Sequence, residues 1–486
     1  MRPAFKLALA VIALTLSPAL AHAEVSTENA QALEQSIHDW LNGLVGSFVA
    51  IPDRPIAIEP EDDHYRVMLP LGDVLTALGL DTSNATFTAE ARPLPGDRWA
   101  IDDIRIPNLK VQLPDSMPGG PLTWSMSVPG QHISAVIDPS LATATTFDAD
   151  ISGQTSTTEG PNGAHASAIE HYVAHSAWVP SGDGRIDIVS STEGQMMKAS
   201  QVMPDGTPVN WSVGRLRGNL HIDGLAAGSF TSILQEAMAL VPAVTEAQQS
   251  GHLPPEARAQ AKQLLMQIRN LLGGVGGSET LEDMRFEAAG HGGSFAKLDF
   301  GFGAAADGGK LDLRVQLALN GVDSPDIPAG PLREYLPRHV AIDPHVSGLP
   351  VEAATQLLLA TIDSDQPDPD EFQEQAMALL QKSPVTVAVD NLDLDLGPAR
   401  LHGAGGVRIS APDAISGDGT ISVAGLDALM KRAMTVPELK PALPVLIMMK
   451  GLGEQQGNTT TWRISYSDDK VMVNDNDLSA MLQGMK

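Results

Sequence analysis

The most constraining feature of this chain is a strict alternation of apolar and polar residues between Gly309 and Gly321. The segment reads GKLDLRVQLALNG, and its alternate positions are Leu311, Leu313, Val315, Leu317 and Leu319. A period of two places these side chains on one face of a strand. It predicts an antiparallel sheet with one buried and one solvated face. The expected partner is FAKLDFGFG (295–303), joined through a turn near Asp307.

Other segments carry weaker versions of the same signal. The chain from about 107 to 206 is rich in Ser, Thr and Gly and predicts several antiparallel strands with long turns. Amphipathic spacing predicts helices after Ser26 or Thr27, around 230–241, and from Pro254 to about Leu272, where GGVGG (273–277) is expected to act as a linker. The remaining expected strands are 64–69, 85–93, 98–106, 391–397 and the hairpin within 461–474.

A glycine followed by leucine recurs where predicted strands lead into predicted helices. Three examples are Gly224-Leu225, Gly348-Leu349 and Gly425-Leu426. Glycine tolerates the positive φ needed to leave a sheet, and the leucine can fill the gap between sheet and helix. Either a module is repeated or the same turn chemistry arose independently. The unequal spacing argues against a regular solenoid.

Two motifs mark the C-terminal part, LDLDLGPARLHGAGGVRISAPDAISGDGTISVAGLDALM (392–430) and the closing pattern W-x-I-x-Y-x-D-x-K-V-x-V-N (462–474). In these motifs it resembles the tail domain of AsmA-like envelope proteins and related bacterial periplasmic families. The resemblance covers about 330–486. It implies a long, curved antiparallel sheet with helices on one side, an export address and no assigned reaction. Some relatives are discussed as lipid-handling proteins. Unlike true AsmA members, this chain is expected to have a cleavable signal and to lack an inner-membrane anchor.

We therefore expect an α+β fold with long curved antiparallel sheets, built from strand–Gly–helix units, with helices packed on one side. The expected organisation is a signal peptide (1–23), an N-terminal β-rich domain with a leading helix (24–205), a region with a helical hairpin and a β-hairpin (206–330), and the AsmA-like α+β region (331–486).

The first 23 residues have the organisation of a secretory signal peptide. Arg2 and Lys6 precede an apolar run of about ten residues, and Ala21-His22-Ala23 is a small-x-small cleavage pattern. A bilayer-spanning helix needs ~20 apolar residues, and no later segment reaches that length without charges or prolines. We expect a periplasmic or secreted protein, cleaved after Ala23.

Composition excludes several classes of site. The chain has no cysteine, which rules out disulfides and thiolate sites. Its formal net charge of −28 argues against nucleic acid and against electrostatic docking to anionic lipid, because both need clustered Lys and Arg. Aromatic residues make up only 4% of the chain, which weakens the case for a sugar-binding cleft.

One histidine-rich segment is a candidate metal site. GAHASAIEHYVAHSAW contains His165, Glu170, His171 and His175. On a helix, His171 and His175 share a face and could bind zinc with help from His165 or Glu170. On a strand, as the neighbouring segments suggest, these two side chains lie ~13 Å apart, too far for one metal.

The acidic run DSDQPDPDE (363–371) has two interpretations. Alternating carboxylates suit calcium, but Asp368 occupies the position where an EF-hand loop needs glycine. We favour a helix start, with Asp368 as N-cap and Pro369 in the first turn. Asp393 and Asp395 are expected to be solvated.

No nucleophile elbow, phosphate-binding loop or dinucleotide fingerprint is present in the sequence. We therefore expect a non-enzymatic binding or scaffold protein of the envelope without a cofactor. Its partner would be a lipid, another apolar ligand or an envelope protein. The alternative is a metal-dependent hydrolase centred on His165–His175.

Overall fold

The computed structural model is largely β: strands account for 61% of the structure and helices for 23%. It describes residues 25–45, 56–77, 80–83, 85–96, 98–113, 121–138, 143–161, 163–203, 205–226, 253–271, 273–327, 333–363, 369–411, 414–467 and 470–479, with scattered residues at 229–244 and at 330. The expected α+β class is thus corrected to a mainly antiparallel open sheet with some helices. The reason is strand length, because the Ser/Thr/Gly-rich region forms strands of 18 to 20 residues.

The chain divides into two compact units. Unit 1 comprises Met1–Ala239 with Asn270–Leu272 and Arg285–Gly290, and unit 2 comprises Leu240–Arg269, Gly273–Met284 and His291–Lys486. The three regions expected from the sequence remain a prediction, because compactness does not establish which segments fold independently.

Unit 1 is an antiparallel sheet of successive neighbours. The order of pairing is β1, β2, β4, β5, β8, β9, β10, β11 and β12. In addition, β7 pairs with the second half of β9, β6 pairs with β7, and β3 pairs with β6. The strands are β1 (Ala57–Glu61), β2 (His64–Pro70), β3 (Asp81–Thr82), β4 (Thr86–Leu94), β5 (Arg98–Arg105), β6 (Leu109–Leu113), β7 (Leu122–Ser127), β8 (Gly130–Asp138), β9 (Thr143–Gly160), β10 (Gly163–Gly182), β11 (Arg185–Val202) and β12 (Pro208–Leu225). Two helices accompany them, α2 (Thr27–Val45) and α3 (Leu71–Ala77).

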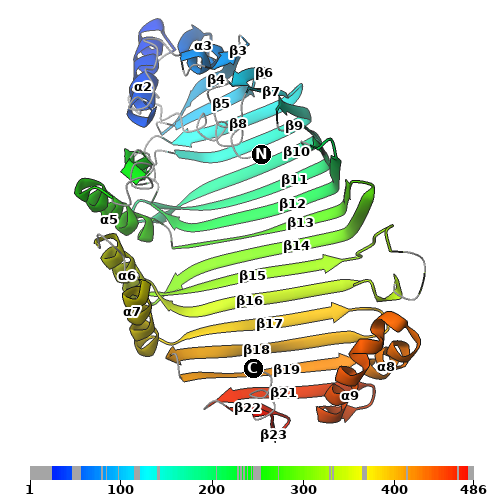
Figure 1. The fold of residues 1–486 in the computed structure, drawn as a ribbon. Helices are drawn as coiled ribbons and strands as arrows, with labels where there is room; N and C mark the ends of the chain where they lie inside the picture. Colours follow the sequence, from blue (N-terminus) through cyan, green and yellow to red (C-terminus); the bar gives the residue numbers. More distant parts are fainter. Residues whose placement is uncertain are drawn as a thin grey trace. The chain divides into compact units, whose positions relative to one another are not determined.

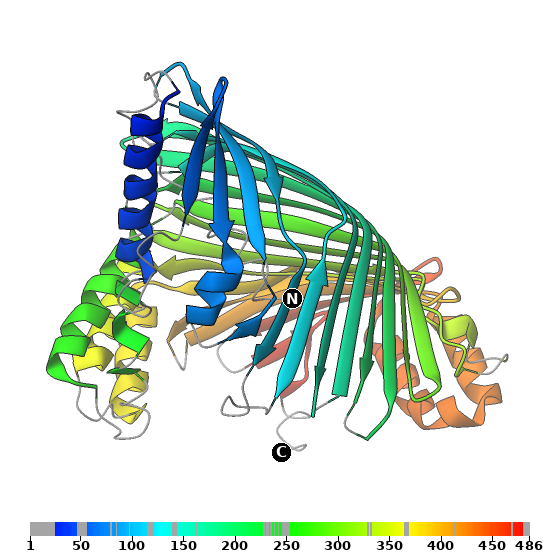
Figure 2. The ribbon, with the colours of Figure 1, turned by 90° about the horizontal axis from the view of Figure 1, so that it is seen from above.

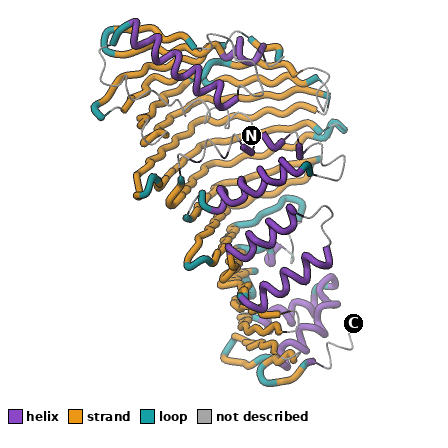
Figure 3. The backbone as a smooth tube through the Cα atoms, turned by 90° about the vertical axis from the view of Figure 1, so that its left-hand side faces the viewer, coloured by secondary structure: helices purple, strands orange, loops and turns teal. Residues whose placement is uncertain are grey.

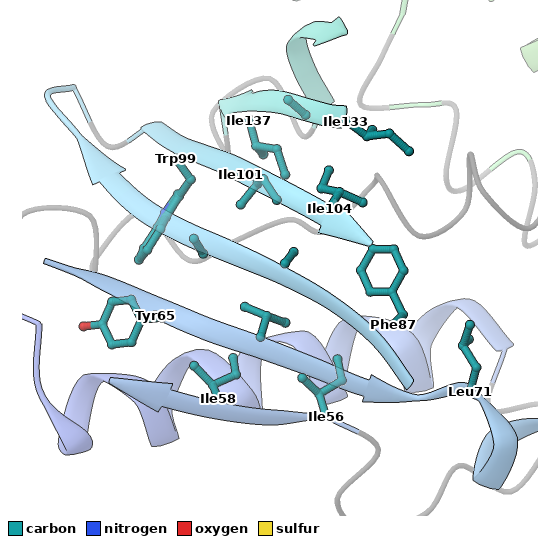
Figure 4. Packing of buried hydrophobic residues seen from close by; sticks show 14 of the residues in the cluster. Ile56, Ile58, Tyr65, Leu71, Phe87, Trp99, Ile101, Ile104, Ile133 and Ile137 are labelled. Carbon is teal, nitrogen blue, oxygen red and sulfur yellow. The ribbon is translucent and has the colours of Figure 1, made fainter. Parts of the chain in front are cut away.

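The core of unit 1 lies between its first strands and α2 (Figure 4). Trp99 and Leu33 are fully buried, and the rings of Tyr65 and Trp99 lie 6.0 Å apart. Ser26 accepts a hydrogen bond from the Asn29 N–H at 3.2 Å, as expected of the N-cap of α2. The leading helix, the strand at 64–69 and the hairpin at 85–106 are all confirmed.

Unit 2 is a second antiparallel series. Strands β14 to β19 pair in chain order, β21 follows β19, and β20 and β22 pair with β21. The strands are β14 (His291–Asp307), β15 (Lys310–Asn320), β16 (His339–Pro350), β17 (Val385–Asp395), β18 (Arg400–Ala411), β19 (Ala414–Ala424), β20 (Glu454–Gln456), β21 (Thr459–Ser467), β22 (Lys470–Val473) and β23 (Asn476–Asp477). The alternating segments predicted as strands are therefore strands.

The helices of unit 2 lie at the two ends of its strands (Figures 1 and 2). α5 (Pro255–Arg269), α6 (Val351–Asp363) and α7 (Pro369–Lys382) contact one another in that order, and Figure 3 shows helices side by side at this end. α8 (Leu426–Thr435), the short η4 (Pro437–Ala442) and α9 (Leu443–Leu452) lie at the opposite end, because they follow β19 whereas α6 and α7 join β16 to β17. The middle of the strands lies between the two groups.

The strand-exit glycines adopt the predicted conformation. Gly224, Gly348 and Gly425 have φ of 59°, 82° and 80°. Gly425 is also the N-cap of α8, and a Cβ there would meet the Pro398 carbonyl oxygen at 2.3 Å. Backbone conformation and close approach of another chain segment both require glycine at 425.

Two expectations for the middle of the chain are not confirmed. The glycine-rich GGVGG does not act as a linker, because β13 (Gly274–Ala288) begins within it. Glycine is compatible with strand pairing, and the strand continues from these glycines to Ala288. The helix expected at 230–241 lies mostly outside the described residues.

Candidate apolar binding surface

Strand register in unit 2 gathers apolar side chains on one face. In the β14–β15 pair, Phe300 lies opposite Leu317, and Phe302 lies opposite Val315. Directly opposed residues in an antiparallel pair share a face. The alternation seen in the sequence of β15 is therefore matched, residue for residue, by the alternation of β14.

The same face continues across three further strands. Ile342 and Val346 of β16 oppose Leu317 and Leu313, and Val346 also opposes Val387 of β17, which opposes Val407 of β18. We call this surface the open apolar face. Its members are Phe300, Phe302, Leu313, Val315, Leu317, Ile342, Val346, Val387 and Val407.

Most of this face is uncovered. Its members on β14, β15, β17 and β18 have exposed fractions between 37% and 43%, although they lie in mid-strand. Asp312, Arg314 and Gln316 on the other face of β15 are exposed as well. The prediction that the leucine face of β15 is buried is therefore wrong. Both faces of this strand are exposed, and its alternation separates an apolar surface from a polar one.

Glycines replace side chains next to the open apolar face. Gly405 of β18 lies opposite Gly419 of β19, and Val407 lies opposite Gly417. A Cβ at Gly405 would meet the Gly419 Cα at 2.7 Å and the Asp418 carbonyl oxygen at 2.8 Å. The glycines of HGAGGV and SGDGT thus permit close strand contact, and they leave this part of the face without side chains.

Helices α8 and α9 cover the apolar side of the sheet at one strand end. Leu426, Val423 and Trp462 form a buried cluster, and strand residues Leu401, Ile421 and Ile464 and helix residues Leu429, Leu446, Met449 and Leu452 pack against it. The Trp462 Nε1–H donates to the Met449 carbonyl oxygen at 2.9 Å. Leu426 thus fills the gap between sheet and helix, as predicted, and Leu429 packs beside it.

The opposite face of these strands is polar and ion-paired. The Arg314 guanidinium donates to Asp390 at 2.5 Å, and this hydrogen bond is the main reason why the pKa of Asp390 lies below its ordinary value. Arg400 donates to both carboxylate oxygens of Asp393, at 3.1 Å and 2.6 Å, and lowers the pKa of Asp393 in the same way. Asp393 was expected to be solvated, but only 13% of its side chain is exposed, because Arg400 covers it.

A hollow of about 380 Å³ also lies over β17, β18, β19 and β21. Its lining includes Thr386, Arg408, Ser416, Asp418 and Ser465. These polar side chains alternate with the apolar ones along the same strands. The hollow therefore does not extend the open apolar face.

The histidine-rich segment is a strand, β10, which favours the second of its two interpretations. His171 pairs with Asp150 at 2.8 Å and His175 with Asp148 at 2.6 Å, so the two histidines have different partners. His165 lies opposite Gln201 and Thr158. In the part of the chain that the structure describes, no three His, Asp or Glu side chains are grouped as a metal site requires.

The start of α7 agrees with the helix-start interpretation of the acidic run. α7 begins at Pro369, as predicted. Asp368, the expected N-cap, lies outside the described residues, as does the predicted signal peptide. Among the described helices, none is both long enough and apolar enough to cross a bilayer.

Comparison with known proteins provides no relative from which the role of the open apolar face could be inferred. Family models, curated proteins and solved structures gave no match to this chain. The residues of the open apolar face were visible in the sequence only as strand alternation. That signal fixes which side chains share a face, but it does not reveal whether anything covers them.

Proposed function

We propose that this protein binds lipid acyl chains, or a similar elongated apolar ligand, on the open apolar face of unit 2. The observation that carries the proposal is the exposure of apolar side chains, in register, along the middle of β14, β15, β17 and β18. Contiguous apolar patches on soluble proteins mark interaction sites, because leaving them in water is costly.

The size of the face suits an extended chain. The four spacings from β14 to β18 add up to about 19 Å. Burying about ten methylene groups contributes roughly 8 kcal/mol, which corresponds to a dissociation constant near 1 µM before ordering costs. An acyl chain lying across the strands therefore has enough contact area for reversible binding.

The difference between the two faces of the sheet supports binding of the ligand on the apolar one. Charged side chains such as Arg314 and Arg400 belong to the polar face and already have carboxylate partners. We propose that helices on one side of the sheet border the apolar face at both strand ends, and that the middle receives the chain. The proposal assigns binding rather than catalysis.

The resemblance of the C-terminal part to AsmA-like envelope proteins agrees with a lipid ligand. From the signal-like sequence at 1–23 we infer that the proposed activity belongs to the periplasm or the cell exterior. Both remain part of the proposal, and the binding experiment below does not depend on either.

The direct test is recovery of bound lipid. The full chain is purified without detergent and extracted with organic solvent, and the extract is analysed by mass spectrometry beside native mass spectrometry of the intact protein. We expect acyl lipid in near-stoichiometric amount, and saturable binding of a fluorescent fatty acid. Absence of lipid from the extract, together with no fatty-acid binding, overturns the proposal.

Neighbouring residues of β15 supply a matched pair of variants. Val315 and Gln316 are both exposed but point to opposite faces of the strand. Val315→Asp should weaken fatty-acid binding at least tenfold, because it places a charge in the apolar face. Gln316→Asp should leave binding unchanged. Equal effects of the two substitutions would place the ligand elsewhere.

A further inference from the structure

A second apolar surface lies on the helices at the end of unit 2. We call residues 426–452, which form α8, η4 and α9, the helical tip. One side of α9 contacts the sheet through Leu446, Met449 and Leu452. The other side exposes Val445, Ile447 and Met448 by 52%, 58% and 47%. A helix that is apolar all round has a second face that the fold of this unit does not bury.

The exposed apolar surface extends beyond α9. Met434 near the end of α8 is 56% exposed, and Pro441 and Ala442 of η4 and Pro444 in the first turn of α9 are exposed as well. Large aliphatic side chains that remain this open on a helix hairpin suit insertion into an apolar medium.

The charge of the helical tip differs from that of the whole chain. Residues 426–452 contain four basic residues, Lys431, Arg432, Lys440 and Lys450, against two acidic ones, Asp427 and Glu438, so the segment has a formal charge of +2 in a chain of −28. The net charge of the chain argues against anionic lipid, but this argument does not apply to a local basic surface. At physiological ionic strength, charges more than about 8 Å away are largely screened.

Two of the four basic side chains are available to contact an anionic partner. Arg432 pairs with Glu334 at 3.3 Å, and Lys450 pairs with Asp427. Lys431 and Lys440 are exposed and have no ion pair with any residue that the structure describes. Lys431 lies three residues before the exposed Met434, and Lys440 lies five residues before the exposed Val445. A segment that exposes both lysines and aliphatic side chains has the composition by which interfacial helices bind anionic membranes.

We propose that the helical tip docks on the surface of a bilayer containing anionic lipid. Met434, Val445, Ile447 and Met448 enter the headgroup boundary, and Lys431 and Lys440 contact the phosphate groups. α9 has only ten residues, which gives a length of about 15 Å, so the contact is peripheral and reversible. This inference is independent of whether the open apolar face holds a ligand.

Sedimentation with vesicles tests the proposal on the full chain. Vesicles of phosphatidylcholine alone are compared with vesicles containing about one third phosphatidylglycerol. We expect binding to the anionic vesicles, weakened by salt. Lys431→Gln with Lys440→Gln should reduce it roughly 25-fold, because each lysine near an anionic surface contributes about a fivefold gain in affinity.

A substitution in the apolar part has a matched control on another helix. Ile447→Asp should abolish vesicle binding, whereas Leu358→Asp on α6, where the leucine is 47% exposed, should not change it. Both positions are exposed, so both variants should keep the circular dichroism spectrum of the parent. Unchanged binding by Ile447→Asp overturns the proposal.

The absence of native cysteine allows a site-specific readout. Ile447→Cys and Leu358→Cys are each labelled with an environment-sensitive fluorophore. Anionic vesicles should shift the emission to shorter wavelength at position 447 only. If vesicles produce no shift and Ile447→Asp instead abolishes self-association in analytical ultracentrifugation, the tip is a protein interface and the membrane proposal is wrong.

Discussion

Phe302 of β14 and Val315 of β15 lie directly opposite each other in an antiparallel pair, and each leaves about two fifths of its side chain exposed, 39% and 41%. A pair of apolar residues in the middle of two strands is normally part of a buried core. Here both faces of the sheet at this position are in contact with solvent.

Truncation on the open apolar face should cost little stability. Leu317→Ala should lower the free energy of unfolding by less than about 1 kcal/mol, because this leucine is already 40% exposed. Ile137→Ala in the core of unit 1, where the side chain is 2% exposed, should cost about 2–5 kcal/mol. Urea denaturation of the full chain measures both. Similar costs would mean that the face is covered in solution.

Gly425 and Gly451 should respond to alanine in opposite directions. Gly425→Ala should destabilise by at least ~1–3 kcal/mol, because φ is +80° and the new Cβ would approach the Pro398 carbonyl. Gly451 lies in α9, and a Cβ there meets no atom within 4 Å. Gly451→Ala should stabilise by about 0.5–1 kcal/mol. Thermal unfolding measures the change in stability of each variant. Destabilisation by Gly451→Ala would contradict the helical conformation described for the end of α9.

The Asp393–Arg400 pair should make stability depend on pH. Arg400 lowers the pKa of Asp393 in the folded state, so the contribution of this pair is present above the unfolded pKa of about 3.9 and is lost as pH falls through the folded pKa. Asp393→Asn should therefore destabilise at pH 7, and the difference from the parent should shrink below about pH 4.

Arg400→Gln provides the control for this pair. It should remove the same pH-dependent component, and the double variant should be little worse than either single one. Urea titrations at pH 7 and pH 3 measure the four proteins. Additive losses in the double variant would show that the two side chains act separately.

The histidines of β10 should behave as independent surface residues. His171 and His175 pair with different aspartates on β9, and isolated exposed ion pairs contribute little. His171→Ala and His175→Ala should leave the unfolding midpoint nearly unchanged. Isothermal titration with zinc should give no stoichiometric binding that either variant removes. Tight binding of one zinc, lost in both variants, would revive the metal-site alternative.

Much of the fold was predictable from local patterns. Alternation predicted β15 and its pairing with β14, the glycine–leucine steps predicted the exits at Gly348 and Gly425, and Ser26 predicted the start of α2. The expected α+β class was corrected to a mainly antiparallel sheet, and GGVGG was taken for a linker. Glycine weakens both helix and strand in isolation, so only the pairing of the surrounding chain could place it in β13.

The candidate surface was predictable only in part. Alternation with a period of two indicates which residues share a face, because successive side chains of a strand point in opposite directions. It says nothing about a covering layer, which depends on where distant segments pack. Asp393 illustrates the same limit, since its cover is Arg400 on the next strand.

The sequence by itself therefore determined the strands, their apolar and polar faces, and the glycine exits, because each depends on neighbours a few residues away. Only the tertiary structure decided that the Leu313–Leu317 face stays open while Trp462 is buried under α9. Burial is a property of segments brought together across long sequence separations, and local periodicity contains no information about which of two apolar faces receives a helix.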